Sequence, residues 1–499
     1  MTLSITVPFH EGETPASAAS RLARANGCDR AWRFCLDMGL NFQDVVNGDP
    51  SALDRLAMLG GFSRKALGDW AIVRGQDAYY LRDETLRSSV LRRTHADVCP
   101  SCLRADTADS RTAMAARPYG RASWQVAGIR TCFEHKVALQ ECRVEQERAT
   151  SHDFAATIEP HLSANNAMID KAVEREPSDF EVYLQARLDE GSGGCAWLDA
   201  LPFYAAANCC EVLGAVALHG PKVHLKRLNR DDMWHAGATG FAIAAEGEAG
   251  IRNLLDEMRG RYRAGGYKWG LRAMFGRLYE WLAHETDDTA YAPLREIIRR
   301  HVFDTMPVGP GDELFGTEFE ERKNHSVQSA SEVYELHPKR LRKLLSDAGY
   351  IDGASSAVTN EWAIFDAATA EPFLRRLARS VPMTEVETYL NVSRPIPRIL
   401  SEHGYIQPFV GTKRGTSGQY AFDPEELDDF LNRLTAMAGD SVAGLAPLNS
   451  AARQANCSQM EIVGLLLDGE LKHVGLDPES QGYAAVHVSV EELEIKVRG

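Results

Sequence analysis

The sequence lacks the long apolar segments that membrane proteins need. No run approaches the roughly 18 consecutive apolar residues that a membrane-spanning helix requires. The first residues, Met1 to Ile5, contain no basic segment followed by an apolar one, so no secretory signal is predicted. We therefore expect a cytoplasmic protein without a membrane partner, in which the ten cysteines do not form a disulfide framework.

An excess of positive charge is also missing. The formal net charge is −15 at pH 7 and the pI is about 5.5. Proteins that coat polyanions without selectivity gain their affinity mainly by neutralising phosphates, so this class is excluded. Local basic surfaces and docking on other proteins remain compatible with the charge. At 499 residues the chain is too long for one hydrophobic core, and several domains are expected.

Catalytic motifs are the third absence. The segment Gly411–Gly415 lacks the spacing of a phosphate-binding Walker A loop, and there is no G-x-S-x-G elbow. Neither His10-Glu11 nor His284-Glu285 continues as H-E-x-x-H. The paired carboxylates Asp287-Asp288 and Asp428-Asp429 are better explained as exposed helix ends or faces. We therefore expect a protein that is not an enzyme.

Two short cysteine motifs stand out from the rest of the sequence. A C-x-x-C pair and a C-x-x-H pair are separated by 29 residues. A two-residue gap lets both ligands face one point, and zinc prefers four N/S ligands in a tetrahedron. A closed site of this kind leaves no position for a reactive water. The sequence predicts one structural Zn²⁺ ion, and its four ligands are Cys99, Cys102, Cys132 and His135.

The C-terminal third of the chain repeats a pattern three times. Each copy has a short helix, a turn, a second helix ending at glycine, an extended stretch and a capped helix. The glycines are Gly349, Gly404 and Gly469. This order is typical of winged helix-turn-helix units, whose second helix enters the major groove of DNA.

Basic residues of the first two copies are the candidates for DNA contact. Four cations fall on the second helix of the first copy, which favours DNA binding over an ordinary charged surface. The third copy has Gln459 and Glu461 there, so a structural or protein-binding role is favoured. Around the zinc ligands the arginines exceed the acids, which fits phosphate contact and a solvated face equally well. The predicted DNA-binding residues are Lys339, Arg340, Arg342, Lys343, Arg394, Arg398, Lys413 and Arg414.

Several of these segments resemble the TniQ/TnsD family of transposition proteins. The N-terminal segment His10–Thr14 and the helix Ser20–Gly27 are similar to the opening of the family, and Val98–Leu103 and Thr131–Cys142 are similar to its two knuckles. Phe275–Leu282 resembles the middle of its longer members. Many members continue from the last cysteine into a second knuckle, which Cys142-Arg143-Val144-Glu145 has lost. One zinc ion is therefore expected.

The resemblance implies a factor that selects the target site of a transposon. Such proteins bind target DNA, or a complex that marks the target, and recruit a AAA-type ATPase and a transposase. Expected partners are thus double-stranded DNA, these two proteins and a guide-RNA complex as an alternative source of targeting, with association to the nucleoid. Homodimer formation stays open.

The sequence therefore predicts a mainly α, multidomain protein with a zinc-knuckle module and tandem winged helix-turn-helix units. Two alternatives remain: a zinc-stabilised protein-interaction scaffold, and a DNA binder like a transcription regulator without a role in transposition. A nuclease would need evidence of metal-dependent cleavage. The expected domains are an N-terminal helical region 1–90, a zinc module 91–150, a central helical domain 151–306, a linker 307–325, and three repeat units 326–380, 381–440 and 441–499.

Overall fold

The computed structural model describes residues 2–108, 113–143, 152–266, 270–351, 358–410 and 420–498. It divides into two compact units, Met1–His301 and Val302–Gly499. The described residues form 25 α-helices and only short strands, so the prediction of a mainly helical fold is confirmed. No helix in the described part is both long and apolar enough to cross a bilayer.

The N-terminal unit begins with five short helices and a small sheet. Thr14, Asp49 and Ser63 start three of the helices by accepting hydrogen bonds from backbone N–H groups of the first turn. Leucines 22, 53 and 56 are fully buried between these helices. The elements are α1 (Pro15–Ala25), α2 (Ala31–Asp37), α3 (Phe42–Val46), α4 (Pro50–Gly60), α5 (Arg64–Asp69) and the antiparallel strands β1 (Ile72–Arg74), β2 (Tyr79–Leu81) and β3 (Glu84–Leu86).

A compact module with little regular structure follows the sheet. Strands β4 (Ala96–Val98) and β5 (Gln140–Cys142) pair antiparallel, with Asp97 opposite Glu141. The helices of this region are α6 (Pro100–Thr107), α7 (Phe154–Leu162) and α8 (Asn165–Asp170). Its apolar core is small and includes the buried cysteines, which is how metal-stabilised modules are built.

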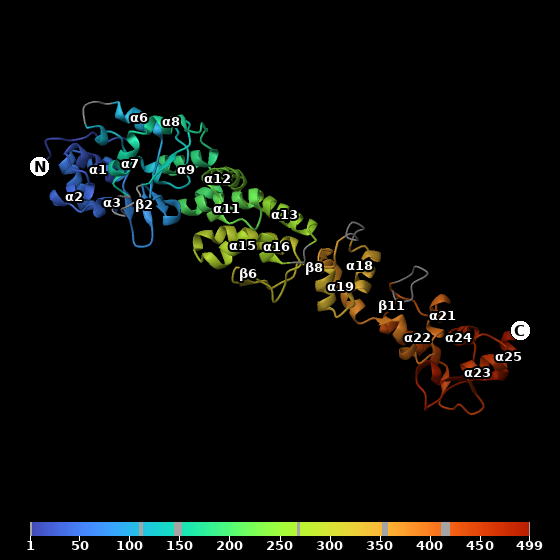
Figure 1. Cartoon of the computed structure of the whole chain (residues 1–499). Helices are drawn as coiled ribbons and strands as arrows, with labels where there is room; N and C mark the ends of the chain where they lie inside the picture. The colour runs from blue at the N-terminus through green and yellow to red at the C-terminus, as the bar shows by residue number, and fades with distance from the viewer. Residues whose placement is uncertain are drawn as a thin grey trace. The chain divides into compact units, whose positions relative to one another are not determined.

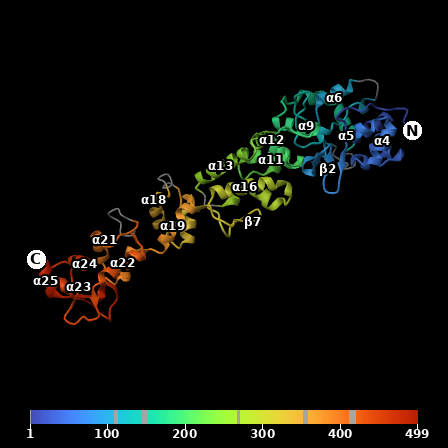
Figure 2. The same cartoon turned by 180° about the vertical axis from the view of Figure 1, so that it is seen from behind.

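Two long helices form the centre of the N-terminal unit and lie side by side in both views (Figures 1 and 2). Gly214 of α11 (Phe203–His219) and Gly240 of α12 (Arg230–Ala245) let the backbones touch. A Cβ on Gly240 would lie 1.7 Å from the carbonyl oxygen of Cys210. The other helices are α9 (Asp179–Glu190), α10 (Ala196–Asp199), α13 (Glu248–Ala264), α14 (Leu271–Phe275), α15 (Arg277–Glu280) and α16 (Ala292–Thr305).

The C-terminal unit opens with a small hairpin and then repeats one arrangement three times. The hairpin strands are β6 (Glu313–Leu314) and β7 (Thr317–Glu318), within the segment expected as a linker. Repeats 1 and 2 have the order strand, helix, helix, strand, helix, and repeat 3 has one more strand after its second helix; in each repeat the first strand pairs antiparallel with the last. The glycine after the second helix has a positive φ in all three: 81° at Gly349, 76° at Gly404 and 69° at Gly469. The repeat inferred from these glycines is present in the fold.

The three repeats have the following elements. Repeat 1 consists of β8 (Asn324–Ser326), α17 (Val327–Val333), α18 (Pro338–Asp347), β9 (Ile364–Asp366) and α19 (Ala367–Ala378). Repeat 2 consists of β10 (Val381–Pro382), α20 (Met383–Leu390), α21 (Ile396–Glu402), β11 (Ala421–Phe422) and α22 (Pro424–Thr435). Repeat 3 consists of β13 (Ala446–Pro447), α23 (Leu448–Gln454), α24 (Gln459–Leu467), β14 (Val474–Leu476), β15 (Val486–Val488) and α25 (Val490–Arg498), and β12 (Ala438–Gly439) adds a parallel strand beside β14.

Repeats 2 and 3 share one hydrophobic core. Leu427 and Phe430 of α22 belong to the same buried cluster as Ile462 and Val463 of α24. The hydroxyl of Tyr405, in repeat 2, donates to the carbonyl of Met460 at 3.2 Å. The second helix of repeat 3 is therefore packed against repeat 2. Repeat 1 has a second core around leucines 341, 344 and 345, and Val410 and Ala421 of repeat 2 belong to it as well.

Candidate metal centre

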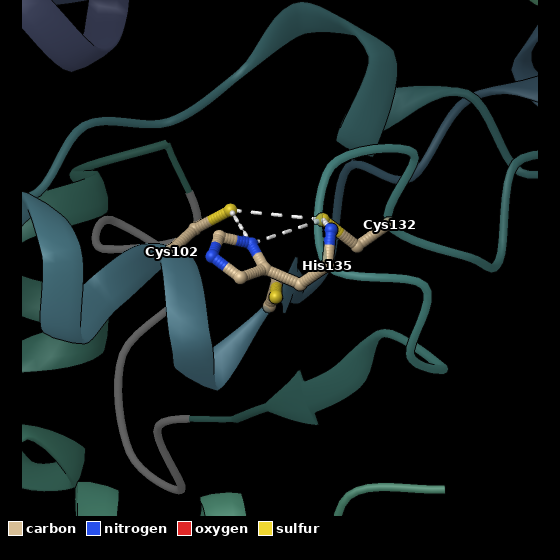
Figure 3. Close-up of side chains that lie close together, drawn as sticks. Cys102, Cys132 and His135 are labelled. Atoms are coloured by element: carbon tan, nitrogen blue, oxygen red, sulfur yellow. Dashed lines mark hydrogen bonds between the residues drawn. The ribbon is translucent and has the colours of Figure 1, made fainter. Parts of the chain in front are cut away.

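The four predicted metal ligands come together in the structure. Their ligand atoms all lie within 4.8 Å of one another. The Sγ of Cys102 is 3.6 Å from the Sγ of Cys132 and 3.3 Å from Nδ1 of His135, and Cys132 Sγ is 3.7 Å from the same nitrogen. Figure 3 shows these three side chains pointing toward one another. The three cysteines are buried, and His135 is partly exposed.

Local backbone structure places each pair of ligands. Cys99 is the N-cap of α6, and Pro100 at the first helical position sets the turn that brings Cys102 to the same side. In the second pair, the N–H of Lys136 donates to the carbonyl of Cys132 and the N–H of Cys132 donates to the carbonyl of Val137, both at 2.9 Å. Lys136 has a φ of 51°, which closes this tight knuckle.

The electrostatics of the group favour a thiolate. The pKa of Cys132 is lowered well below its ordinary value, because its sulfur accepts hydrogen bonds from Cys102 and Cys99 and from the backbone N–H of His135. The same contact with Cys132 raises the pKa of Cys102. A buried thiolate beside an imidazole nitrogen is a donor set for a soft or borderline divalent metal ion. The residues present therefore fit a bound metal ion.

A buried network ties the chain between the two knuckles to the N-terminal helices. The guanidinium of Arg21 donates to both carboxylate oxygens of Glu13, at 2.9 and 2.8 Å, and to the carbonyl of Ala116 at 3.0 Å. Burial raises the pKa of Glu13, and the charge of Arg21 opposes that rise. The N–H of Thr14 donates to the carbonyl of Gly120 at 3.1 Å. These contacts join the two N-terminal segments quoted for the family resemblance to the chain that lies between the two knuckles.

The comparison with protein families agrees with this arrangement. Residues 4–139 match the family model described as TniQ. The chain carries a TniQ domain. The resemblance noted in the sequence is therefore confirmed over this range, which includes both the Arg21–Glu13 network and all four candidate ligands. A search of curated proteins finds no significant match.

One cysteine and one histidine near the candidate metal centre are not part of it. Cys142 lies in β5 opposite Ala96, fully buried, and is not in the ligand group. His95 lies near Asp97 and Glu141 instead. Asp97 is already engaged there, because Arg92 and Arg230 both pair with it, at 2.8 and 2.5 Å. Sequence reasoning missed these pairs, since Arg230 is far from Asp97 in the chain.

The structure separates the predicted DNA-binding cations of α18 into two kinds. Lys339 and Lys343 are exposed. Arg342 donates to Oδ1 of Asn360 at 2.8 Å and to the carbonyl of Val358 at 2.7 Å, so it holds the chain that follows the helix. Arg340 is half-buried beside Glu385, and burial lowers its pKa.

In α21 and its preceding turn, the cations are on the surface. Arg394 is exposed, and Arg398 is exposed and paired with Glu402 at 2.9 Å. Lys413 and Arg414, predicted at the tip of a wing, lie outside the described residues.

Proposed function

We propose that this chain is an adaptor that selects target sites for DNA transposition. In this role it binds target DNA or a complex that marks the target, and it recruits the transposon's AAA-type ATPase and transposase without cutting DNA. The TniQ domain is the observation that carries the proposal. The three repeats, each with two helices joined by a short turn as in a helix-turn-helix, support a role on DNA.

Equivalent cations in two repeats support direct DNA contact. Lys339 and Arg394 each lie ten residues before the glycine that ends the second helix, and Lys343 and Arg398 each lie six residues before it. All four are exposed. At the matching positions repeat 3 has Gln459 and Val463, and Val463 is fully buried. In this proposal repeats 1 and 2 present these cations to DNA, and repeat 3 presents none at the same positions.

The bound metal is proposed to be one structural Zn²⁺ ion. In a zinc tetrahedron with Zn–S of about 2.3 Å and Zn–N of about 2.0 Å, two sulfurs lie about 3.8 Å apart and a sulfur and a nitrogen about 3.5 Å apart. The separations of 3.3 to 3.7 Å among Cys102, Cys132 and His135 are close to these values. Cys99 supplies the fourth ligand. The ion would replace core packing in this module.

DNA binding by the full chain tests the proposal. The double variant Lys339→Ala/Lys343→Ala should weaken binding of a target duplex and lower the slope of log K against log salt by about two, one for each lost phosphate contact. The control is Arg453→Ala/Lys472→Ala, which removes two exposed charges from repeat 3. Equal losses of DNA binding in both variants, or no loss in Lys339→Ala/Lys343→Ala, would show that α18 does not contact DNA.

A second candidate function is an interaction scaffold whose targeting comes from a partner complex. The net charge of −15 and the burial of the second helix of repeat 3 favour it. The scaffold predicts stable co-purification with an ATPase, a transposase or a guide-RNA complex and no binding to DNA by the chain alone. Specific binding of the isolated chain to duplex DNA would exclude it.

A further inference from the structure

A pocket of about 480 Å³ lies in the N-terminal unit between β5, the segment before β4 and the start of α12. It is separate from the metal ligands. Its charged lining consists of Arg92, Arg93, His95, Arg130, Glu141 and Arg230. Leu228 and Met233 contribute apolar wall. The pocket thus combines several guanidinium groups with an apolar surface.

Three of the arginines are held in place by the protein itself. Arg92 donates to the carbonyls of Trp124 and Val126, at 2.9 and 2.5 Å, and to the carbonyl of Ala127 at 2.7 Å. Arg130 pairs with Glu211 at 2.7 Å. Arg230 donates to both oxygens of Asp97, at 2.9 and 2.5 Å. Side chains ordered in advance lose little rotamer entropy when a ligand arrives.

The fourth arginine has no carboxylate partner among the described residues. The guanidinium of Arg93 lies over the ring of Tyr79, 4.8 Å from its centroid, and is half-buried. Burial lowers the pKa of Arg93, and the charge of Arg74 lowers it further. Burial also lowers the pKa of Arg92 to about 10; the carboxylate of Asp97 opposes that effect, and the charges of Arg130 and Arg230 add to it. Arg92, Arg130 and Arg230 therefore repel one another, which Asp97 and Glu211 offset in part and an anion in the pocket would offset further.

A metal ion does not fit the same place. The ligand atoms of His95, Asp97 and Glu141 lie within 4.8 Å of one another, as a cation site would require. Both oxygens of Asp97 are already bonded to Arg230, and Arg92 pairs with the same carboxylate at 2.8 Å. A divalent cation would have to displace these guanidinium groups and remain beside them. The electrostatics exclude that occupant.

We propose that this pocket binds the phosphate of a nucleotide, and that Arg93, which forms no hydrogen bond or ion pair with the described residues, is the arginine that contacts it. A guanidinium matches phosphate oxygens with two parallel hydrogen bonds. The volume exceeds that of a phosphate alone, and the Leu228 and Met233 wall accommodates the attached sugar or base. The nucleotide is part of a DNA strand or free in solution. Binding of a nucleotide within DNA rests on the proposed function, and binding of a free nucleotide does not.

The experiment measures binding of the full-length protein to AMP, to a labelled single strand and to a labelled duplex. Arg93→Ala should weaken nucleotide binding about tenfold, the effect of losing a charge-assisted contact. Glu141→Gln removes the acid from the lining and should tighten binding about threefold. Arg104→Ala is the matched control, because Arg104 is an exposed arginine of the same module outside the pocket. Metal content and melting temperature should be unchanged in all three variants.

The outcomes separate this proposal from the proposed function. If only the binding of AMP depends on Arg93, the ligand of the pocket is a free nucleotide. If the binding of the DNA strands depends on Arg93, the ligand is DNA. Equal effects of Arg93→Ala and Arg104→Ala, no effect of Arg93→Ala on any probe, or Arg93-dependent binding of a poly-glutamate peptide in place of nucleotides would overturn it. Loss of duplex binding in Lys339→Ala/Lys343→Ala with normal binding in Arg93→Ala would leave the adaptor function standing without the pocket.

Discussion

Cys99 is the N-cap residue of α6 and belongs to the ligand group, but its side chain makes no capping hydrogen bond, so its loss acts through the metal site. Cys99→Ser should release the metal ion and unfold the region around residues 91–142, because metal-binding free energy is folding free energy in such modules. The repeats of the C-terminal unit should remain folded. Metal analysis, expected to give about one zinc per wild-type chain, and hydrogen exchange by region check both points. Two zincs per chain, or none, would contradict the assignment.

His325 makes repeat 1 sensitive to acid. It is buried between Tyr334 and Phe365, and burial, with repulsion from Arg322, lowers its pKa to about 4. The unfolded chain, with an ordinary pKa of about 6.5, binds more protons than the folded chain between these values. The stability of the repeat is therefore fully present above about pH 6.5 and falls as the pH drops toward 4, by about 2 kcal/mol at pH ~5.

The prediction for His325 is tested by urea-dependent proteolysis within residues 324–378 at two pH values. His325→Phe should remove most of the loss of stability that repeat 1 shows at about pH 5. His337→Gln, which changes an exposed histidine of the same repeat, should keep it. An unchanged acid sensitivity in His325→Phe would assign the effect to other groups.

At the scale of elements, the closest contact is that of α11 with α12. Gly240→Ala would place a methyl group 1.7 Å from a backbone oxygen of α11, which no side-chain rotation relieves. We expect a loss of about 2 kcal/mol or more in stability of the N-terminal unit. Gly260→Ala in α13 is the control, since a Cβ there meets nothing within 4 Å and alanine favours a helix by roughly 0.5–1 kcal/mol. Thermal unfolding should shift in opposite directions for the two variants.

At the scale of the whole molecule, repeat 3 is expected to stabilise repeat 2 and not to read DNA. Val463→Lys places a cation at the position that corresponds to Lys343 and Arg398, but Val463 lies in the shared core. Burying an unpaired charge there should cost several kcal/mol and loosen α22 as well as α24. Gln459→Lys, at a partly exposed position, should be tolerated. Tighter DNA binding by a stable Val463→Lys protein would refute this view; hydrogen exchange in both helices provides the stability measurement.

Local signals in the sequence predicted the grouping of the four candidate ligands and the repeats. The spacing of Cys99 and Cys102 is set within one turn of chain, and the left-handed backbone at position 349 favours glycine whatever surrounds it. Contacts between distant residues could not be predicted this way. Asp97 pairs with Arg230 only because the fold brings them together. The same is true of Arg21, which pairs with Glu13 and also donates to the carbonyl of Ala116. The division of the α18 cations into exposed lysines and engaged arginines depends on such contacts too.

The shared core of repeats 2 and 3 also limits how this chain can evolve. A helix-turn-helix unit with a core of its own can be lost without unfolding its neighbour. Here α24 of repeat 3 packs into the core of repeat 2, and Leu427, Phe430 and Leu434 would lose part of their packing if residues 441–499 were deleted. Neither copy can then be lost, exchanged or recombined alone. The last two repeats should therefore be inherited as a single block.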